Sequence, residues 1–138
     1  MDISLQQVGY LYGKDTPFEK RALYGVDAMI TSGSYTAIVG HTGSGKSTLL
    51  MHLNGLLKPS EGVVKVGELE IDRKTKAKKL REIRRRVGIV FQFPDHQLFE
   101  ETVLKDIMFG PLNYGMKEEE AEKRAYELLD LLGLPEEV

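Results

Sequence analysis

The 138-residue sequence contains no cysteine. That absence excludes disulfide bonds and thiolate metal sites, which is in keeping with a reducing cytosol. The sequence also has no apolar run of about 18 residues, and residues 1–30 lack the basic start and continuous apolar stretch of a signal peptide. We therefore expect neither a membrane span nor an export signal.

An excess of charge of either sign is missing too. The 19 basic and 21 acidic residues give a net charge of -2, so the chain has no global attraction for nucleic acid or for an anionic membrane surface. A hydrophobic content of 41% allows one core of ordinary domain size. We expect one domain, or part of one, and no nucleic-acid partner.

The beginning of the chain is typical of antiparallel β-structure. Ile3, Leu5 and Val8 to Tyr12 suggest a strand with aromatic character, and a turn-rich GKDTP segment separates it from a second expected strand at residues 22–30. Residues 62–71 alternate as a hairpin does, with Gly67 at the bend. These segments predict an antiparallel β subdomain.

The middle of the chain predicts strand, loop and helix. Tyr35 to Val39 form an expected short buried strand that ends at Gly40, and residues 47–57 are expected to be helical until Lys58-Pro59 stops the helix. Val87 to Phe91 form a second compact apolar strand that runs into Gln92. This order predicts an α/β fold.

Residues 72–86 carry nine Lys or Arg against two acids. Leu80, Ile83 and Val87 are spaced to form one apolar stripe, so a solvated helix lying on the fold is expected. A patch that faces phosphate or a partner is the alternative.

The last third of the chain predicts helices. A loop from residue 93 leads to a helix closed by Gly110-Pro111. Residues 117–132 are amphipathic, with a Glu-rich start, Gly133 as C-cap and Pro135 as terminator. The expected apolar face consists of Ala121, Ala125, Leu128, Leu129 and Leu132.

The stretch GHTGSGKSTLL, residues 40–50, matches the pattern G-x-x-x-x-G-K-[ST]. After a strand and before a helix, such a loop presents backbone N–H groups and the positive end of the helix to an anion. Gly43 and Gly45 allow close approach of the backbone, Lys46 places an ammonium at the terminal phosphates, and Ser47 offers a hydroxyl to Mg²⁺. The expected nucleotide-binding residues are Gly40, His41, Thr42, Gly43, Ser44, Gly45, Lys46, Ser47 and Thr48.

This loop, the downstream VGIVFQFP and the block FQFPDHQLFEETVLKDIMFGPLNYG together resemble the ATPase subunits of energy-coupling factor transporters, within the ABC transporter family. The likeness covers essentially all 138 residues. It implies a P-loop NTPase core with an antiparallel β subdomain in residues 1–92, and a glutamine-loop segment with the start of a helical subdomain in residues 93–138.

The resemblance implies roles for two further side chains. Tyr12 matches the aromatic residue that stacks on adenine. Strand alternation puts Tyr10 on the same face, so Tyr10 is the rival, and a tyrosine with a purely structural role is the alternative. Gln92 matches the glutamine that reaches Mg²⁺ and the attacking water, and a polar strand end is the alternative for this residue. The expected catalytic residues are therefore Lys46 and Gln92, and the expected metal contacts are Ser47 and Gln92.

The resemblance also implies partners. Asp95 to Glu101 match the segment that contacts a transmembrane coupling subunit. Leu98 and Phe99 are then expected to be exposed until that subunit docks, and the alternative is that these two side chains are buried in the core. A second ATPase subunit completes the site, and a substrate-binding membrane subunit is coupled indirectly. ATP and Mg²⁺ are the implied cofactors, at the cytoplasmic face of the membrane. His41, His52 and His96 have no second ligand at metal spacing and are expected to be non-catalytic.

Several motifs of such an ATPase are missing from the 138 residues. The sequence has no apolar strand ending in Asp-Glu, no LSGGQ-like signature and no switch histidine. We therefore expect the N-terminal portion of a longer ATPase, inactive by itself, that energises uptake of a vitamin or transition-metal ion. The alternatives are a nucleotide-binding or assembly module without turnover, or another P-loop NTPase such as a kinase or GTPase.

Overall fold

The computed structural model describes residues 1–135 and divides into two compact units, Met1–Ile89 and Val90–Val138. The resemblance implies a different division, after residue 92, between subdomains of a complete ATPase domain. That division stays a prediction.

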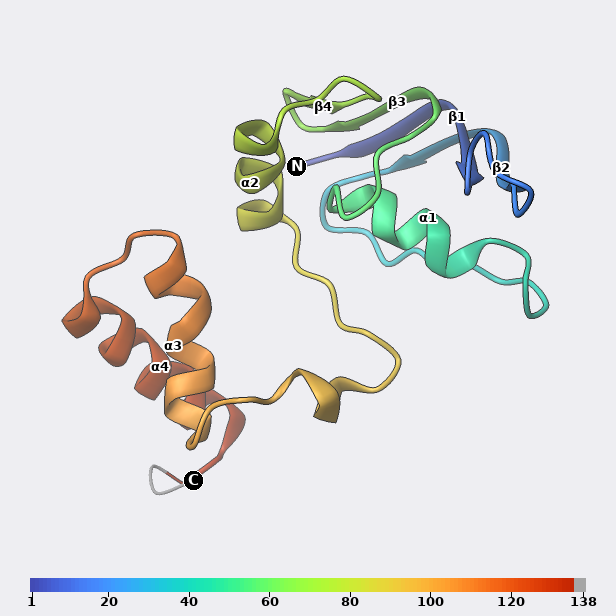
Figure 1. Ribbon diagram of the computed structural model, residues 1–138. Helices are drawn as coiled ribbons and strands as arrows, with labels where there is room; N and C mark the ends of the chain where they lie inside the picture. The colour runs from blue at the N-terminus through green and yellow to red at the C-terminus, as the bar shows by residue number, and fades with distance from the viewer. Residues whose placement is uncertain (136–138) are drawn as a thin grey trace. The chain divides into compact units, whose positions relative to one another are not determined.

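The first unit contains an antiparallel sheet with the strand order β2-β1-β3-β4 (Figure 1). Its strands are β1 (Ile3–Tyr12), β2 (Lys20–Ile30), β3 (Glu61–Val66) and β4 (Leu69–Ile71). Gly67, with a φ of 57°, turns the chain between β3 and β4, a conformation that glycine adopts without steric cost. The predicted antiparallel strands and the predicted hairpin are confirmed.

A β-bulge interrupts β1 and decides which side chains point to the core. Leu5 and Val8 are both buried, although three residue steps separate them and strict alternation would put them on opposite faces. Their partners on β2 are only two steps apart, so one residue of β1 is extra. Gln7 takes up the extra length with a φ of 50°, and its backbone N–H donates to Oδ1 of Asp27 at 2.8 Å. Asp27 thus satisfies a donor that the bulge removes from the sheet.

Helix α1 (Lys46–Leu53) follows the glycine-rich loop and packs on the sheet. Leu53 joins one buried cluster with Leu5, Val8 and other strand residues. The predicted helix end at residue 57 is wrong, because the helical segment stops at Leu53. Gly55 has a φ of 70°, which ends the helix, and its backbone lies so close to Leu80 that an added Cβ would be 2.9 Å from Leu80 Cδ2.

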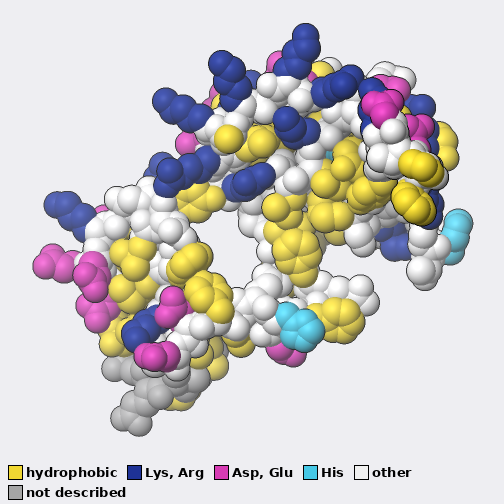
Figure 2. Space-filling model, in the orientation of Figure 1, with side chains coloured by type: hydrophobic (Ala, Val, Ile, Leu, Met, Phe, Trp, Pro, Cys, Tyr) yellow, Lys and Arg dark blue, Asp and Glu magenta, His cyan; other side chains and the backbone are white. Residues whose placement is uncertain are grey.

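Helix α2 (Ala77–Arg86) confirms the apolar stripe expected on this segment. Leu80 and Ile83 are buried in the same cluster as the strands, and Val87 packs against it. Arg84 donates to the carbonyl of Gly55 at 2.7 Å, which ties α2 to the turn after α1. Figure 2 shows Lys and Arg side chains gathered around this helix. The helix therefore lies on the fold with its basic side chains outward.

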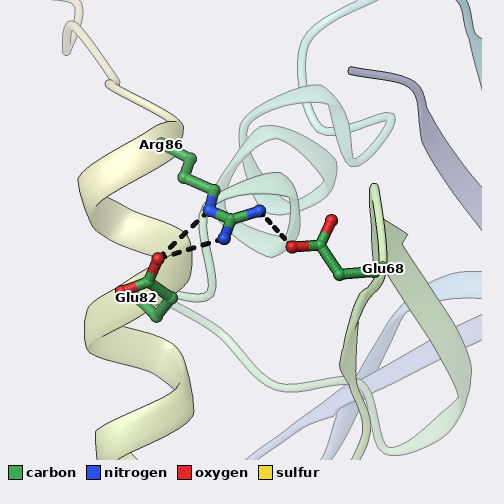
Figure 3. A network of polar contacts seen from close by, with 3 residues as sticks. All are labelled: Glu68, Glu82 and Arg86. Carbon is green, nitrogen blue, oxygen red and sulfur yellow. Dashed lines mark hydrogen bonds and ion pairs between the residues drawn. The ribbon is translucent and has the colours of Figure 1, made fainter.

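Arg86 links the end of α2 to the β3–β4 hairpin (Figure 3). Its guanidinium lies 2.6 Å from a carboxylate oxygen of Glu68 and 3.1 Å from one of Glu82. Two hydrogen bonds lower the pKa of Glu68: the larger effect comes from the Glu68 backbone, and the smaller one from Arg86. Because these side chains are solvent-exposed, the pairs orient the hairpin more than they stabilise it.

Two predicted strands are wrong. Residues 35–39 and 87–91 have no strand structure, and neither segment belongs to the sheet. Val39 is 93% exposed, so the predicted burial of residues 35–39 is wrong as well. Val90 is 78% exposed. A strand is held by the backbone hydrogen bonds of its neighbours, and an apolar sequence without a neighbouring strand cannot form one.

The second unit begins with a short 3₁₀ helix, η1 (Pro94–Gln97), and is built on α3 (Val103–Asn113) and α4 (Glu118–Leu132). The predicted end of α3 at Gly110-Pro111 is wrong, since Pro111 lies inside the helix. The helix instead ends at Asn113, and Gly115, two residues further on, turns the chain with a φ of 87°. The N–H of Met116 donates to the carbonyl of Pro111 at 3.0 Å, which is typical of a glycine-terminated helix.

Helix α4 confirms the predicted amphipathic segment and its glycine terminus. Ala121, Ala125 and Leu129 are buried, and Gly133 ends the helix with a φ of 67°. Leu132 is 67% exposed, so its predicted place on the buried face is wrong. At 100° per residue, Leu132 has almost the same direction as Ala121 and Ala125 on the helix, so its exposure comes from its position at the end of α4 and not from the face on which it lies.

Candidate nucleotide-binding site

The glycine-rich loop, residues 40–45, leads directly into α1, and residues 46–48 form the first turn of that helix. Gly45 is the N-cap residue, with φ 93° and ψ 5°, and α1 begins at Lys46. The first N–H groups of a helix have no acceptor within the helix. Gly45 provides no side chain to accept them, so these donors and the positive end of the helix are available to an anion.

Close packing holds this helix start against the sheet. A Cβ added at Gly45 would lie 2.8 Å from the carbonyl oxygen of Ala22 and 3.2 Å from Leu23 Cδ2, both on β2. Only glycine fits both this space and the positive φ. Gly43 also has a positive φ, 84°, but an added Cβ there would meet nothing within 4 Å. The two glycines therefore serve different purposes, packing at Gly45 and chain reversal at Gly43.

The ammonium group of Lys46 lies over the loop. Its Nζ donates to the carbonyl oxygens of Gly40 at 2.6 Å and His41 at 2.9 Å. A lysine that hydrogen-bonds to the loop's own carbonyls is held near the position that a phosphate would occupy, and a phosphate oxygen can replace those acceptors. The loop therefore has a fixed positive charge beside free helical donors, which is the arrangement that binds polyphosphate.

Magnesium would be held here mostly through the nucleotide. Ser47 is exposed in the first turn of α1, where its hydroxyl can reach a cation bound to phosphate. In residues 1–135 no group of three or more His, Cys, Asp or Glu side chains could hold a metal ion. Mg²⁺ commonly keeps few protein ligands beside substrate phosphates and water, so the residues present fit Mg²⁺ bound to a nucleotide.

Tyr12 lies next to the loop. Its hydroxyl and that of Thr48 share a hydrogen bond of 3.0 Å, and Thr48 is buried in the first turn of α1. The rings of Tyr10 and Tyr12 meet edge to face with centroids 4.8 Å apart, which confirms that both lie on one face of β1. Tyr12 is 37% exposed, whereas burial of Tyr10 raises the pKa of its hydroxyl. Tyr12 is thus the better placed of the two to receive a planar base.

Sequence reasoning missed the part of His52 in this arrangement. Its ring is fully buried, Nδ1 lies 2.7 Å from the carbonyl of Thr48, and the ring meets Tyr10 at 4.8 Å. Burial lowers the pKa of His52, and backbone groups of Thr48 and Lys58 act in the opposite direction. The Lys58 contact falls short of hydrogen-bond geometry, so Nε2 has no hydrogen-bond partner among the described residues. The spacing of four residues between Thr48 and His52 on one helix was the available signal.

The second unit contains Gln92 and the expected partner-facing segment. Gln92 lies in a bend and is exposed, so its predicted contact with Mg²⁺ stays a prediction. Leu98 and Phe99 are 64% and 63% exposed, so their alternative as core residues is wrong. Phe99 stacks edge to face on Phe109 of α3 at 4.7 Å. In the described part of the chain, no helix has the length and apolar character needed to cross a membrane.

A glycine-rich loop with a tethered lysine, opening a helix that packs on an antiparallel sheet, defines a nucleotide-binding protein of the phosphate-loop class. A family model described as ABC transporter matches residues 23–137. The chain therefore belongs to the ABC transporter family.

Curated relatives narrow this likeness. The chain is 61% identical over 138 residues to the "Energy-coupling factor transporter ATP-binding protein EcfA2" of Listeria welshimeri, covering all of this chain and 48% of the relative. The protein of the same name from Bacillus licheniformis is 57% identical, with the same coverage. The chain thus spans about half the length of the curated relatives it matches.

Solved structures agree with the family. CbiO1 of Clostridium perfringens, part of the ABC transporter complex CbiONQ, has a TM-score of 0.77 and 36% identity, over 96% of this chain and 50% of that one. The ATP-binding cassette MJ0796 bound to ADP and Pi has a TM-score of 0.81 and 32% identity, over 98% of this chain and 59% of that one. The expected fold class, an α/β ABC ATPase domain with an antiparallel sheet plus helices, is confirmed.

Proposed function

We propose that this chain forms the N-terminal, ATP-binding half of an ATPase subunit that energises an energy-coupling factor importer for a vitamin or a transition-metal ion. The 61% identity to an energy-coupling factor ATP-binding protein carries the proposal. The loop supports it, because Lys46 lies over backbone carbonyls beside the uncapped start of α1. The family match favours this function over a kinase or a GTPase.

The residues of the loop bind and orient the nucleotide. The N–H groups at the start of α1 donate to phosphate oxygens, and Lys46 exchanges its loop carbonyls for the terminal phosphates. Ser47 contributes a hydroxyl to Mg²⁺, which when bound supplies charge stabilisation at the transferred phosphoryl group. Tyr12 stacks on the adenine, and Gln92 positions the attacking water. Catalysis of this kind is mainly positioning and charge stabilisation.

The partners follow from the same relationship. Asp95 to Glu101 contact the transmembrane coupling subunit, and the exposed side chains of Leu98 and Phe99 give this segment an apolar surface to bury. A second ATPase subunit, identical or a paralogue, completes each composite site, and a substrate-binding membrane subunit is coupled indirectly. The assembly works at the cytoplasmic face of the membrane.

A lysine substitution tests the proposal in the full-length protein that contains residues 1–138. Lys46→Ala should lower ATP turnover by about 10²- to 10³-fold, the usual cost of removing one charge-stabilising group. Lys78→Ala, at an exposed lysine of α2, is the matched control and should leave turnover unchanged. Turnover that survives in Lys46→Ala, or stabilisation of the wild type by Mg-GTP and not by Mg-ATP in a thermal shift, would contradict the proposed function.

Residues 1–138 alone are a separate case. The sequence has no apolar strand ending in Asp-Glu and no LSGGQ-like stretch, so the isolated chain should hydrolyse ATP at a negligible rate. Steady-state phosphate release from the purified chain measures this, and release that Lys46→Ala abolishes would refute it.

A further inference from the structure

We propose that Thr48 is a positioning residue for Tyr12, so that the phosphate-binding loop itself fixes the side chain that receives the base. The inference rests on the proposed function, since it concerns the same nucleotide site. It assigns to the Thr48 side chain a task beyond its place in the loop, namely selection of a purine nucleotide over a bare polyphosphate.

The contact between the two hydroxyls is the first observation. Tyr12 is at the end of β1, and Thr48 is in the first turn of α1, 36 positions later. Their oxygens are 3.0 Å apart, and Thr48 is only 8% exposed while the Tyr12 side chain is 37% exposed. A partly exposed tyrosine would otherwise sample several rotamers, so a buried hydroxyl partner holds the ring in one of them.

The surroundings of Thr48 and Tyr12 are the second observation. The carbonyl of Thr48 is 2.7 Å from Nδ1 of His52, His52 meets Tyr10 at 4.8 Å and 76°, and Tyr10 meets Tyr12 at 4.8 Å and 89°. Together with the contact between the hydroxyls of Tyr12 and Thr48, these three contacts close a ring that starts and ends at Tyr12. The edge-to-face contact with Tyr10 restrains the Tyr12 ring on one side, and the hydroxyl of Thr48 restrains it at the tip.

The consequence concerns the balance between base and phosphate binding. The loop donors and Lys46 recognise phosphate, and they do not distinguish ATP from inorganic triphosphate. A ring that is fixed before the base arrives lowers the entropy cost of stacking, which favours the ligand that carries a base. The hydroxyl pair should therefore affect ATP affinity and leave triphosphate affinity unchanged.

Calorimetric titration of the full-length protein with Mg-ATP and with Mg-triphosphate tests this. Tyr12→Phe keeps the ring and removes only the hydroxyl; it should weaken ATP binding by about 2- to 12-fold, the range for one neutral hydrogen bond, and leave triphosphate binding unchanged. Thr48→Val should lower the ratio of ATP to triphosphate affinity by the same factor, and Thr48→Ser should restore it. Tyr24→Phe, at an exposed tyrosine of β2, is the control and should change neither constant.

The double variant Tyr12→Phe/Thr48→Val decides whether the two hydroxyls act together. If they do, the affinity ratio of the double variant equals that of either single variant. Additive effects, an unchanged ratio in Tyr12→Phe, or tighter ATP binding by Tyr12→Phe would each overturn the positioning role while leaving the proposed function in place. Wild-type protein that binds neither ligand would instead overturn the proposed function, and the positioning role with it.

Discussion

Replacement of Gly45 by alanine is the sharpest test of how α1 packs against the sheet. The new Cβ would sit 2.8 Å from the carbonyl oxygen of Ala22 and 3.2 Å from Leu23 Cδ2, so the start of the helix must shift away from β2. A left-handed φ at a residue with a side chain costs about 1–2 kcal/mol. Overpacking adds about 1–3 kcal/mol, so Gly45→Ala should lower the free energy of unfolding by about 2–5 kcal/mol in total.

Gly43→Ala is the matched control for this experiment. Its φ of 84° gives similar backbone strain, but the added methyl group meets nothing within 4 Å. It should cost only the strain, about 1–2 kcal/mol. The change in unfolded-chain entropy is common to both substitutions and cancels in the comparison.

Urea unfolding followed by far-UV circular dichroism measures both variants against the wild type. The difference between them, about 1–3 kcal/mol, isolates the contact with β2. Equal destabilisation by the two substitutions would refute the reasoning, because it would mean that Gly45 does not lie against Ala22.

Two further predictions concern the buried histidine and the bulge. Burial lowers the pKa of His52 in the folded state, so its contribution to stability is fully present above the unfolded pKa of about 6.5 and falls as the pH drops below it, by at most about 1.4 kcal/mol per pH unit. Chemical denaturation between pH 7 and 5.5 should show this slope in the wild type and in His41→Gln but not in His52→Leu. An unchanged slope in His52→Leu would contradict the prediction. Asp27→Ala removes the acceptor of the exposed Gln7 N–H and should lower the free energy of unfolding by about 0.5–1.5 kcal/mol in urea titrations. A variant as stable as the wild type would show that the carboxylate does not support the bulge.

Much of the first unit could be predicted because its signals are local. Apolar and aromatic residues identify β1 and β2, Gly67 marks the bend between β3 and β4, and the stripe of Leu80 and Ile83 shows which face of α2 is buried. Each of these signals depends on residues a few positions apart. The same holds for the loop, whose pattern predicts the start of a helix at the lysine to within one residue.

The segments that were predicted wrongly depend on distant partners. Residues 35–39 have the composition of a buried strand, yet composition cannot provide the neighbouring strand that would pair with them. Pro111 shows the opposite case, since proline usually ends a helix and here lies in its last turn, where the chain continues to Gly115. The contact of Tyr12 with Thr48 is equally hidden, because it joins residues 36 positions apart.

The extra residue in β1 has a consequence for how this protein can vary. Leu5 and Tyr12 are seven positions apart, an odd interval, and a regular strand would turn their side chains to opposite sides of the sheet. The bulge at Gln7 restores the parity, so both tyrosines of β1 share the side occupied by α1. Loss of a single residue from this strand would therefore turn either its hydrophobic end or its aromatic end outward, so chain length here matters as much as residue type.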